Sequence, residues 1–264
     1  MKINVLVIGD IVGKPGRIIL KNKLKTYTDK ENIHFCIANG ENAAGGAGIT
    51  EDIAKELFSY GVDVITSGDH IWDKKDIMHF LETNRYILRP ANYSPLAVGR
   101  GYTVKDSTAG IPIAVINLLG RVFMKPVDCP FRVVDDILKT ISRETKAIFV
   151  DMHAEATSEK IAMGWYLDGR VSAVCGTHTH VPTADERILP KRTAVISDLG
   201  MTGPHESVLG RKIECVLKAI VTQMPVRFDV AEGDVRINGA MIVVDSQTGQ
   251  AESIKRVEIK EDYK

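Results

Sequence analysis

The sequence predicts an α/β protein built around a mostly parallel sheet, with a second sheet beside it. Short apolar runs alternate with helix-like segments in the first third of the chain, and this βαβαβ alternation is typical of a parallel sheet. Residues 226–230 and 235–244 near the end alternate between apolar and polar side chains, which is the pattern of half-buried strands. We expect these later strands to belong to the second sheet.

Composition favours one globular domain. The chain has 264 residues, of which 44% are hydrophobic, enough for a full core. It contains no internal repeat, low-complexity tract or linker, so we predict a single domain over residues 1–264. Lys plus Arg equal 34 and Asp plus Glu equal 34, a balance that argues against binding to duplex nucleic acid or an anionic membrane. Without a signal peptide or a long apolar segment, the protein is expected to be soluble and cytoplasmic.

Apolar runs predict the strands. The first of them, residues 3–8, is almost continuously apolar and suits a strand covered on both faces. The full set comprises residues 3–8, 33–38, 62–66, 111–116, 147–150, 171–175, 193–196, 226–230 and 235–244. Within the last run, Asn238 and Gly239 favour a turn or a bulge.

Capping signals predict the helices. Pro15 can open a helix that runs to about residue 24, because proline suits the first helical position. Thr50, Asp73 and Ser158 can each cap a helix that follows. Two further helices are expected over residues 131–142 and around residues 206–221.

The cysteines indicate no metal or disulfide framework. The chain has four cysteines and no CxxC pair, so a structural zinc site is not expected. Cys36 and Cys175 lie in strand-like runs, and we interpret them as buried, reduced thiols.

Five of the predicted strands end at a residue that can bind a metal. These residues are Asp10, Glu41 with Asn42, Asp69 with His70, His153, and His178 with His180. The carboxyl ends of parallel strands share one edge of a sheet, and neighbouring strands lie ~4.8 Å apart. We therefore expect these side chains to converge on one pocket.

The ligand types indicate which metals fit. Carboxylate, amide and imidazole ligands without thiolate favour iron, manganese, zinc or cobalt. Without His70, which lies beside Asp69, seven candidates remain, which are too many for one ion and about right for two. Two ions ~3.5–4 Å apart can activate water for attack on a phosphoester, and a neighbouring side chain can protonate the departing oxygen.

Other polar residues admit more than one interpretation. The glycine-rich loop at residues 45–48 lacks the lysine and hydroxyl of a phosphate-binding P-loop, so we expect it to be shape-permitting backbone. Thr157 and Ser158 can direct helix N–H groups toward an anion or simply cap a helix. Three arginines are open candidates for phosphate or carboxylate contacts, and one histidine for the pocket rim: Arg89, Arg121, Arg170 and His205.

The strand-end motifs resemble, in order, the five-motif pattern of calcineurin-like metallophosphoesterases. They lie at residues 9–10, 39–42, 68–70, 153 and 176–180. More specifically, the chain resembles the bacterial YmdB family over nearly its whole length. That resemblance is carried by residues 9–17, 40–44, 89–92, 117–121, 153–159, 176–185 and 201–205.

The resemblance implies more than the spacing does. It implies a four-layer α/β/β/α sandwich of two mixed sheets and a two-metal centre, often of iron, with manganese or zinc as alternatives. It also implies phosphodiesterase activity on 2′,3′-cyclic nucleotides, a homo-oligomer and a regulatory role in bacterial cells. By the same resemblance, one metal is expected on Asp10, Asn42 and His180. The other is expected on Asp69, His153 and His178, with Glu41 bridging and His70 as proton donor to the leaving oxygen.

Asp69 departs from the pattern, because the family usually has asparagine there. Two divalent ions carry four positive charges, which three carboxylates and a bridging hydroxide would balance. An asparagine would leave one positive charge unbalanced. We hypothesise that Asp69 tightens metal binding, or favours a more highly charged ion, and lowers Lewis acidity toward the substrate.

Two other functions remain open at the level of sequence. One is a phosphomonoesterase or 5′-nucleotidase that uses the same metals with a different pocket. The other is a regulatory binding protein whose metal site organises a partner surface and whose hydrolysis is incidental. Parallel assays on a cyclic nucleotide and its monoester separate the first from a phosphodiesterase. A catalytically dead but metal-loaded variant tests the second.

Overall fold

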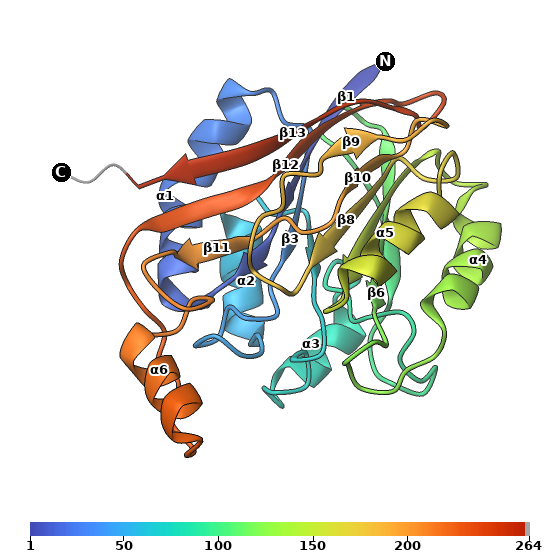
Figure 1. The fold of residues 1–264 in the computed structure, drawn as a ribbon. Helices are drawn as coiled ribbons and strands as arrows, with labels where there is room; N and C mark the ends of the chain where they lie inside the picture. Colours follow the sequence, from blue (N-terminus) through green and yellow to red (C-terminus); the bar gives the residue numbers. More distant parts are fainter. Residues whose placement is uncertain (262–264) are drawn as a thin grey trace.

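Two sheets pack face to face and helices cover their outer faces (Figure 1). The computed structural model describes residues 1–261. The first sheet contains β1 (Lys2–Ile8), β2 (Asp10–Ile11), β3 (Phe35–Asn39), β4 (Val64–Thr66), β11 (Met201–Pro204), β12 (Val235–Asp245) and β13 (Ala251–Lys260). The second contains β5 (Tyr102–Asp106), β6 (Pro112–Leu119), β7 (Ala147–His153), β8 (Ala173–Thr177), β9 (Arg187–Ile188) and β10 (Ala194–Ile196).

Both sheets are mixed. In the first, β1, β3 and β4 are parallel, whereas β12 runs antiparallel to β1 and β13 antiparallel to β12. In the second, β6, β7, β8 and β10 are parallel, and the edge strands β5 and β9 are antiparallel. Strand β12 pairs with β1, so the prediction that residues 235–244 belong to the second sheet was wrong. The middle of the chain supplies that sheet.

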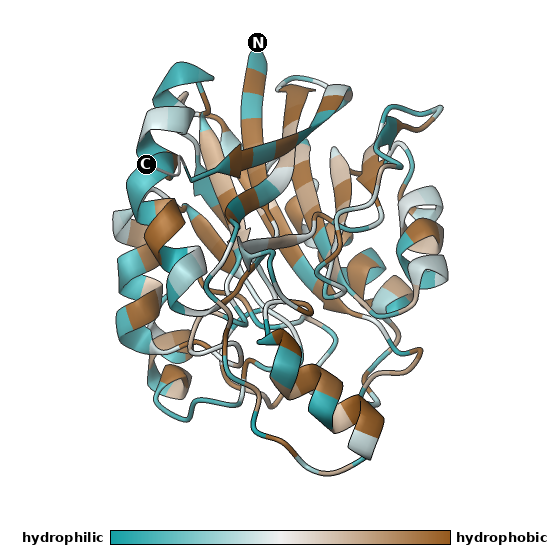
Figure 2. Ribbon diagram, turned by 60° about the vertical axis from the view of Figure 1, so that its left-hand side comes forward, coloured by the Kyte–Doolittle hydropathy of each residue, from teal (hydrophilic) through white to brown (hydrophobic). Residues whose placement is uncertain are grey.

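Three apolar cores separate the layers. Ile3, Val115 and Ile242 belong to the core between the two sheets. A second core lies under α1 (Gly13–Lys30), α2 (Glu51–Ser59) and α3 (Ile77–Thr83), and a third under α4 (Pro130–Ile141) and α5 (Thr157–Tyr166). Figure 2 shows the central strands mostly in the hydrophobic colour, whereas the outer helices carry both colours. This arrangement confirms the predicted four-layer α/β/β/α sandwich.

Several helix boundaries differ from the prediction. The first helix continues to Lys30 rather than ending near residue 24. Helix α3 begins after Asp76, without a side-chain capping bond, so the prediction that Asp73 caps it was wrong. The last helix, α6 (Ile213–Thr222), begins later than residue 206, because Leu209 and Gly210 adopt positive φ angles of 52° and 89° that a right-handed helix excludes.

Capping was predicted correctly once. The Thr50 side chain accepts a hydrogen bond from the Ile53 backbone N–H and begins α2. Helix α5 begins after Ala156 without a side-chain cap, so Ser158 does not have the capping role that was predicted.

One strand prediction and one turn prediction in the tail were wrong. Residues 226–229 form no strand, and Val230 makes only an isolated bridge to Arg211. Asn238 and Gly239 lie inside β12 instead of in a turn. A Cβ atom at Gly239 would lie 2.3 Å from the Val7 carbonyl oxygen, so this glycine allows the close approach of β12 to β1.

The thiols agree with the expectation from sequence. The four cysteines are free, and burial raises the pKa of Cys36 and Cys175, which keeps both protonated. Within residues 1–261, every helix is too short or too polar to cross a membrane.

Candidate metal centre

The predicted ligands lie where the carboxyl ends of strands from both sheets meet. Asp10 comes two residues after the end of β1 and begins the short β2, Glu41 follows β3 and Asp69 follows β4, all in the first sheet. His153 is the last residue of β7, and His178 follows β8, both in the second sheet. The pocket is thus shared by two sheets, rather than formed at one edge as the sequence predicted.

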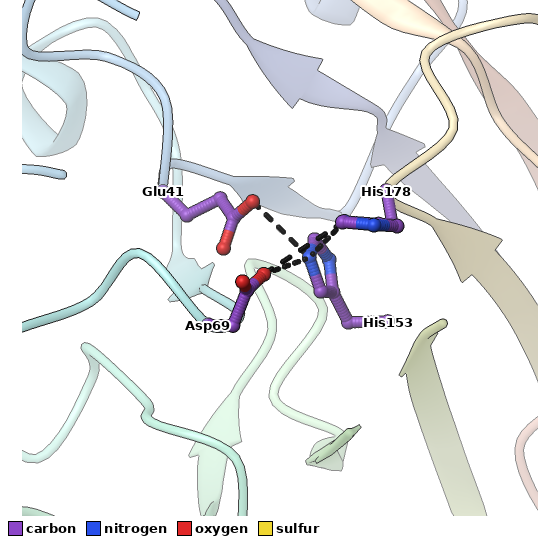
Figure 3. Close-up of side chains that lie close together, drawn as sticks. All are labelled: Glu41, Asp69, His153 and His178. Carbon is purple, nitrogen blue, oxygen red and sulfur yellow. Dashed lines mark hydrogen bonds and ion pairs between the residues drawn. The ribbon is translucent and has the colours of Figure 1, made fainter. Parts of the chain in front are cut away.

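Four of these side chains form a compact cluster (Figure 3). One ligand atom from each of Glu41, Asp69, His153 and His178 lies within 4.8 Å of those of the other three. The His153 Nε2 atom is 3.1 Å from Glu41 Oε1 and 3.0 Å from His178 Nδ1. Asp69 Oδ1 lies 3.6 Å from His153 Nε2 and 3.8 Å from His178 Nδ1. These atoms point at a common centre, as the ligands of one ion must.

A second group of predicted ligands also contacts Glu41. The Asn42 side-chain nitrogen is 3.4 Å from Asp10 Oδ1 and 3.2 Å from His180 Nε2. The same nitrogen donates to Glu41 Oε1 at 3.2 Å, and His180 Nε2 lies 3.8 Å from Asp10 Oδ1. The structure therefore brings all seven predicted ligands together, with Glu41 in contact with both groups.

His70 lies beside the cluster and is partly open to solvent. Its Nδ1 atom is 3.2 Å from Asn42 Oδ1 and 3.4 Å from Glu41 Oε1. Its side chain is 37% exposed, whereas that of Glu41 is fully buried. The imidazole can therefore reach a molecule that enters from solvent while it touches the base of the cluster.

The electrostatics of the pocket favour a cation. Burial alone would raise the pKa of Glu41, but the charge and hydrogen bonds of His153 and His70 hold it well below its usual range. Burial disfavours charge on His153 as well, yet the neighbouring carboxylates raise the pKa of His153 well above its usual range. Asp69 Oδ1 is buried and makes no hydrogen bond. An orphaned carboxylate oxygen beside imidazole nitrogens suits a transition metal.

A buried hydrogen-bond network orients His153, and its carboxylate, Asp151, was not predicted from the sequence. The Thr177 hydroxyl donates to Asp151 Oδ1 at 2.6 Å and lies 2.9 Å from His153 Nδ1. Because that hydroxyl proton goes to Asp151, the oxygen accepts from Nδ1–H, and Nε2 is the nitrogen that faces the cluster. The available signal was spacing, since Asp151 lies two residues before His153 and therefore on the same face of β7.

The other predicted candidates lie outside this pocket or serve the backbone. Arg89 donates to the carbonyl oxygens of Pro90, Ala97 and Val98, and Arg170 pairs with Asp135. The Arg121 backbone N–H donates to Glu159. His205 contacts Asn238 and the Met201 carbonyl oxygen. In the glycine-rich loop, the carbonyl oxygens of Gly45 and Gly46 accept from Arg211. None of these contacts places an arginine on the ligand cluster.

Comparison with known proteins identifies the family. The model of the YmdB-like protein family matches residues 6–257. This chain belongs to the YmdB-like family. The match covers every cluster residue, so the resemblance inferred from the strand-end motifs is confirmed.

Relatives of this YmdB-like protein match it almost end to end. The 2′,3′-cyclic-nucleotide 2′-phosphodiesterase of Bacillus subtilis (strain 168) is 49% identical over 259 residues, covering 98% of each chain. The crystal structure of a hypothetical protein from Thermus thermophilus superposes with a TM-score of 0.92 at 38% identity, covering 98% of this chain and 100% of the other. A novel phosphatase from Mycoplasma pneumoniae gives a TM-score of 0.92 at 33% identity, covering 99% and 95%. These similarities therefore extend over both sheets and over all the residues of the candidate metal centre.

Proposed function

We propose that this YmdB-like protein is a binuclear metal-dependent phosphodiesterase that hydrolyses 2′,3′-cyclic nucleotides. The observation that carries the proposal is the pair of adjacent ligand groups that share Glu41. A relative that is 49% identical over 98% of both chains is named as a 2′,3′-cyclic-nucleotide 2′-phosphodiesterase, which supports the substrate class.

The donor set divides between two ions. Asp10, Asn42 and His180 would hold one, and Asp69, His153 and His178 the other, with Glu41 between them. Iron is the metal we propose, with manganese and zinc as alternatives, because imidazole and carboxylate donors suit all three. When bound, such ions would supply Lewis acidity that activates water for attack on phosphorus and would stabilise the charge that develops.

The protein residues hold this pocket in place and supply a proton. Glu41, His153 and Asp10 are fully buried, so their positions are set before a substrate arrives. His70 is partly open to solvent and contacts Asn42 and Glu41. We assign to it donation of a proton to the leaving ribose oxygen, a role that requires a side chain within hydrogen-bond reach of the substrate.

The test is a parallel assay of the metal-loaded protein on a 2′,3′-cyclic nucleotide and on the corresponding nucleoside monophosphates. We expect turnover of the cyclic ester and accumulation of a monophosphate. Rapid release of inorganic phosphate from the monophosphate, with a slow reaction on the cyclic ester, would instead identify a phosphomonoesterase or 5′-nucleotidase. Metal analysis of protein purified without added metal gives the number and identity of the ions.

We also propose that the chain acts as one catalytic domain, in the cytoplasm, as a homo-oligomer. The family match over residues 6–257 supports the first point. The third rests on the family resemblance, and light scattering of the purified protein tests it.

A further inference from the structure

The loop that carries His178 and His180 has an unfavourable backbone. His178 has a φ of 99° and His180 a φ of 65°, on either side of Thr179. Residues other than glycine seldom adopt positive φ angles, and such conformations persist only where the surrounding structure imposes them. Some contact outside the loop must therefore hold these two histidines in place.

Asp198 holds the middle of this loop. Its side chain is 1% exposed, and its Oδ2 atom accepts from the Thr179 hydroxyl at 2.7 Å and the Thr179 backbone N–H at 3.1 Å. Its other oxygen accepts from the Gly200 N–H at 2.8 Å. At the ends of the loop, the His178 N–H donates to Asp10 at 3.0 Å and the His180 carbonyl oxygen accepts from the Met201 N–H at 3.0 Å. Thr179 is thus attached through its side chain as well as its backbone.

Lys160 balances the charge of Asp198. Its Nζ atom lies 2.6 Å from Asp198 Oδ2, and its side chain is 3% exposed. A buried carboxylate without a cation would be strongly disfavoured, and a paired one keeps its charge for charge-assisted hydrogen bonds. Lys160 belongs to α5, which begins four residues after His153. The ion pair connects α5, which follows the proposed ligand His153, to Asp198. Asp198 in turn bonds to the loop that carries the other two histidines.

We propose that Lys160, Asp198 and Thr179 are positioning residues that hold His178 and His180 in metal-binding geometry. None of the three belongs to the ligand cluster, so they act through the histidines. The inference rests on the proposed function, because it takes the two histidines as ligands. It predicts that cutting the link at Thr179 weakens metal binding even when the Lys160–Asp198 pair stays intact.

The test compares Thr179→Val with Thr179→Ser. Valine keeps the shape of threonine and the backbone N–H but removes the hydroxyl that Asp198 accepts, whereas serine retains it. The readouts are the affinity for Mn²⁺ alone, measured by calorimetry on protein first stripped with chelator, and the Tm without metal. We expect Thr179→Val to bind Mn²⁺ about 10–100-fold more weakly than wild type, the range typical of groups that orient metal ligands. Thr179→Ser should remain close to wild type.

Thr145→Val is the matched control. The Thr145 hydroxyl likewise donates a part-buried hydrogen bond, to the Pro112 carbonyl oxygen at 2.6 Å, but it lies just before the amino end of β7, away from the cluster. We expect this variant to lower the Tm and leave Mn²⁺ affinity unchanged. Thr179→Ala, which removes the same hydroxyl without an added methyl branch, serves if the valine variant does not fold.

The outcomes separate this inference from the proposed function. Equal Mn²⁺ affinity of wild type and the folded variant lacking the hydroxyl overturns the positioning role alone. A serine variant as weak as the valine variant overturns it as well, because the hydroxyl would then not be the cause. Wild-type protein that binds neither Mn²⁺, Fe²⁺ nor Zn²⁺ overturns the proposed function together with the inference.

Discussion

Histidines of the pocket differ in how much of each side chain reaches solvent. His153 is fully buried, whereas the side chains of His178 and His70 are 20% and 37% exposed. A ligand that must stay fixed is best buried, and a group that exchanges protons with a substrate must be reachable. The most exposed of the three, His70, is the one that we propose as the acid, and the fully buried His153 is a proposed ligand.

Replacing His70 by alanine should lower turnover of a 2′,3′-cyclic nucleotide by ~10²–10⁴-fold, the range expected for loss of general acid catalysis. Metal content should not change, because the cluster of four ligands does not include His70. His79→Ala is the matched control, since His79 is an exposed histidine on the nearby helix α3. Turnover that survives in the His70 variant would remove its assigned role. A dead, metal-loaded His70 variant that still supports the cellular function would favour a regulatory binding protein.

Asp69→Asn tests the charge balance of the pocket. Asp69 Oδ1 is buried without a hydrogen bond and lies 3.6 Å from His153 Nε2, so its charge is available to a cation. The asparagine variant should bind Mn²⁺ more weakly, by ~10-fold or more. Its turnover at saturating metal should rise, since one negative charge no longer reduces the Lewis acidity of the site. Calorimetry and steady-state rates measure the two effects. Metal content, affinity and turnover that all match wild type would refute the charge-balance hypothesis.

At the scale of elements, the turn after β4 must approach β3 and β7 very closely. A Cβ atom at Gly68 would lie 2.2 Å from Glu41 Oε2 and from His153 Nε2. Real Cβ atoms do not approach other atoms that closely, so only glycine allows this turn to bring Asp69 to the cluster. Gly68 therefore sets how closely the proposed ligands Glu41, Asp69 and His153 can approach one another.

Gly68→Ala should therefore displace Glu41 or His153 and abolish tight metal binding and turnover. Gly110→Ala provides the comparison, because a Cβ atom at Gly110 meets nothing within 4 Å, although its φ of 71° adds backbone strain. The control should lose some stability and keep its activity. Metal analysis, turnover and the Tm of both variants check this expectation. Normal metal content in the Gly68 variant would contradict it.

For the whole molecule, the metals are expected to stabilise the sandwich, because their ligands come from both sheets. An ion present at one hundred times its Kd stabilises the folded state by ~2.7 kcal/mol, provided that the unfolded chain does not bind it. Stripping with chelator should therefore lower the Tm and abolish turnover, and returning Fe²⁺ or Mn²⁺ should restore both. Hydrolysis of cyclic nucleotides that continues at the same rate after thorough stripping would contradict a metal-dependent reaction.

The candidate metal ligands could be predicted from short stretches of the sequence. The residues that hold those ligands in position could not. Asp10, Glu41, Asp69, His153 and His178 each follow or end an apolar run that is visible in the sequence. Lys160 and Asp198 are ordinary charged residues in the sequence. Their importance depends on burial and on partners far along the chain, as in the pair of Lys160 with Asp198. Periodicity carries no information about such partners.

The same difference between local and distant information applies to the fold. The sequence alone determined the fold class and the ligand types, because apolar periodicity and residue chemistry are local properties of the chain. Only the tertiary structure decided that β12 and β13 return to the first sheet, that the pocket lies between two sheets, and which groups hold the loop of His178 and His180. Strand pairing and buried ion pairs depend on which distant surfaces pack together, and that is a property of the folded chain as a whole.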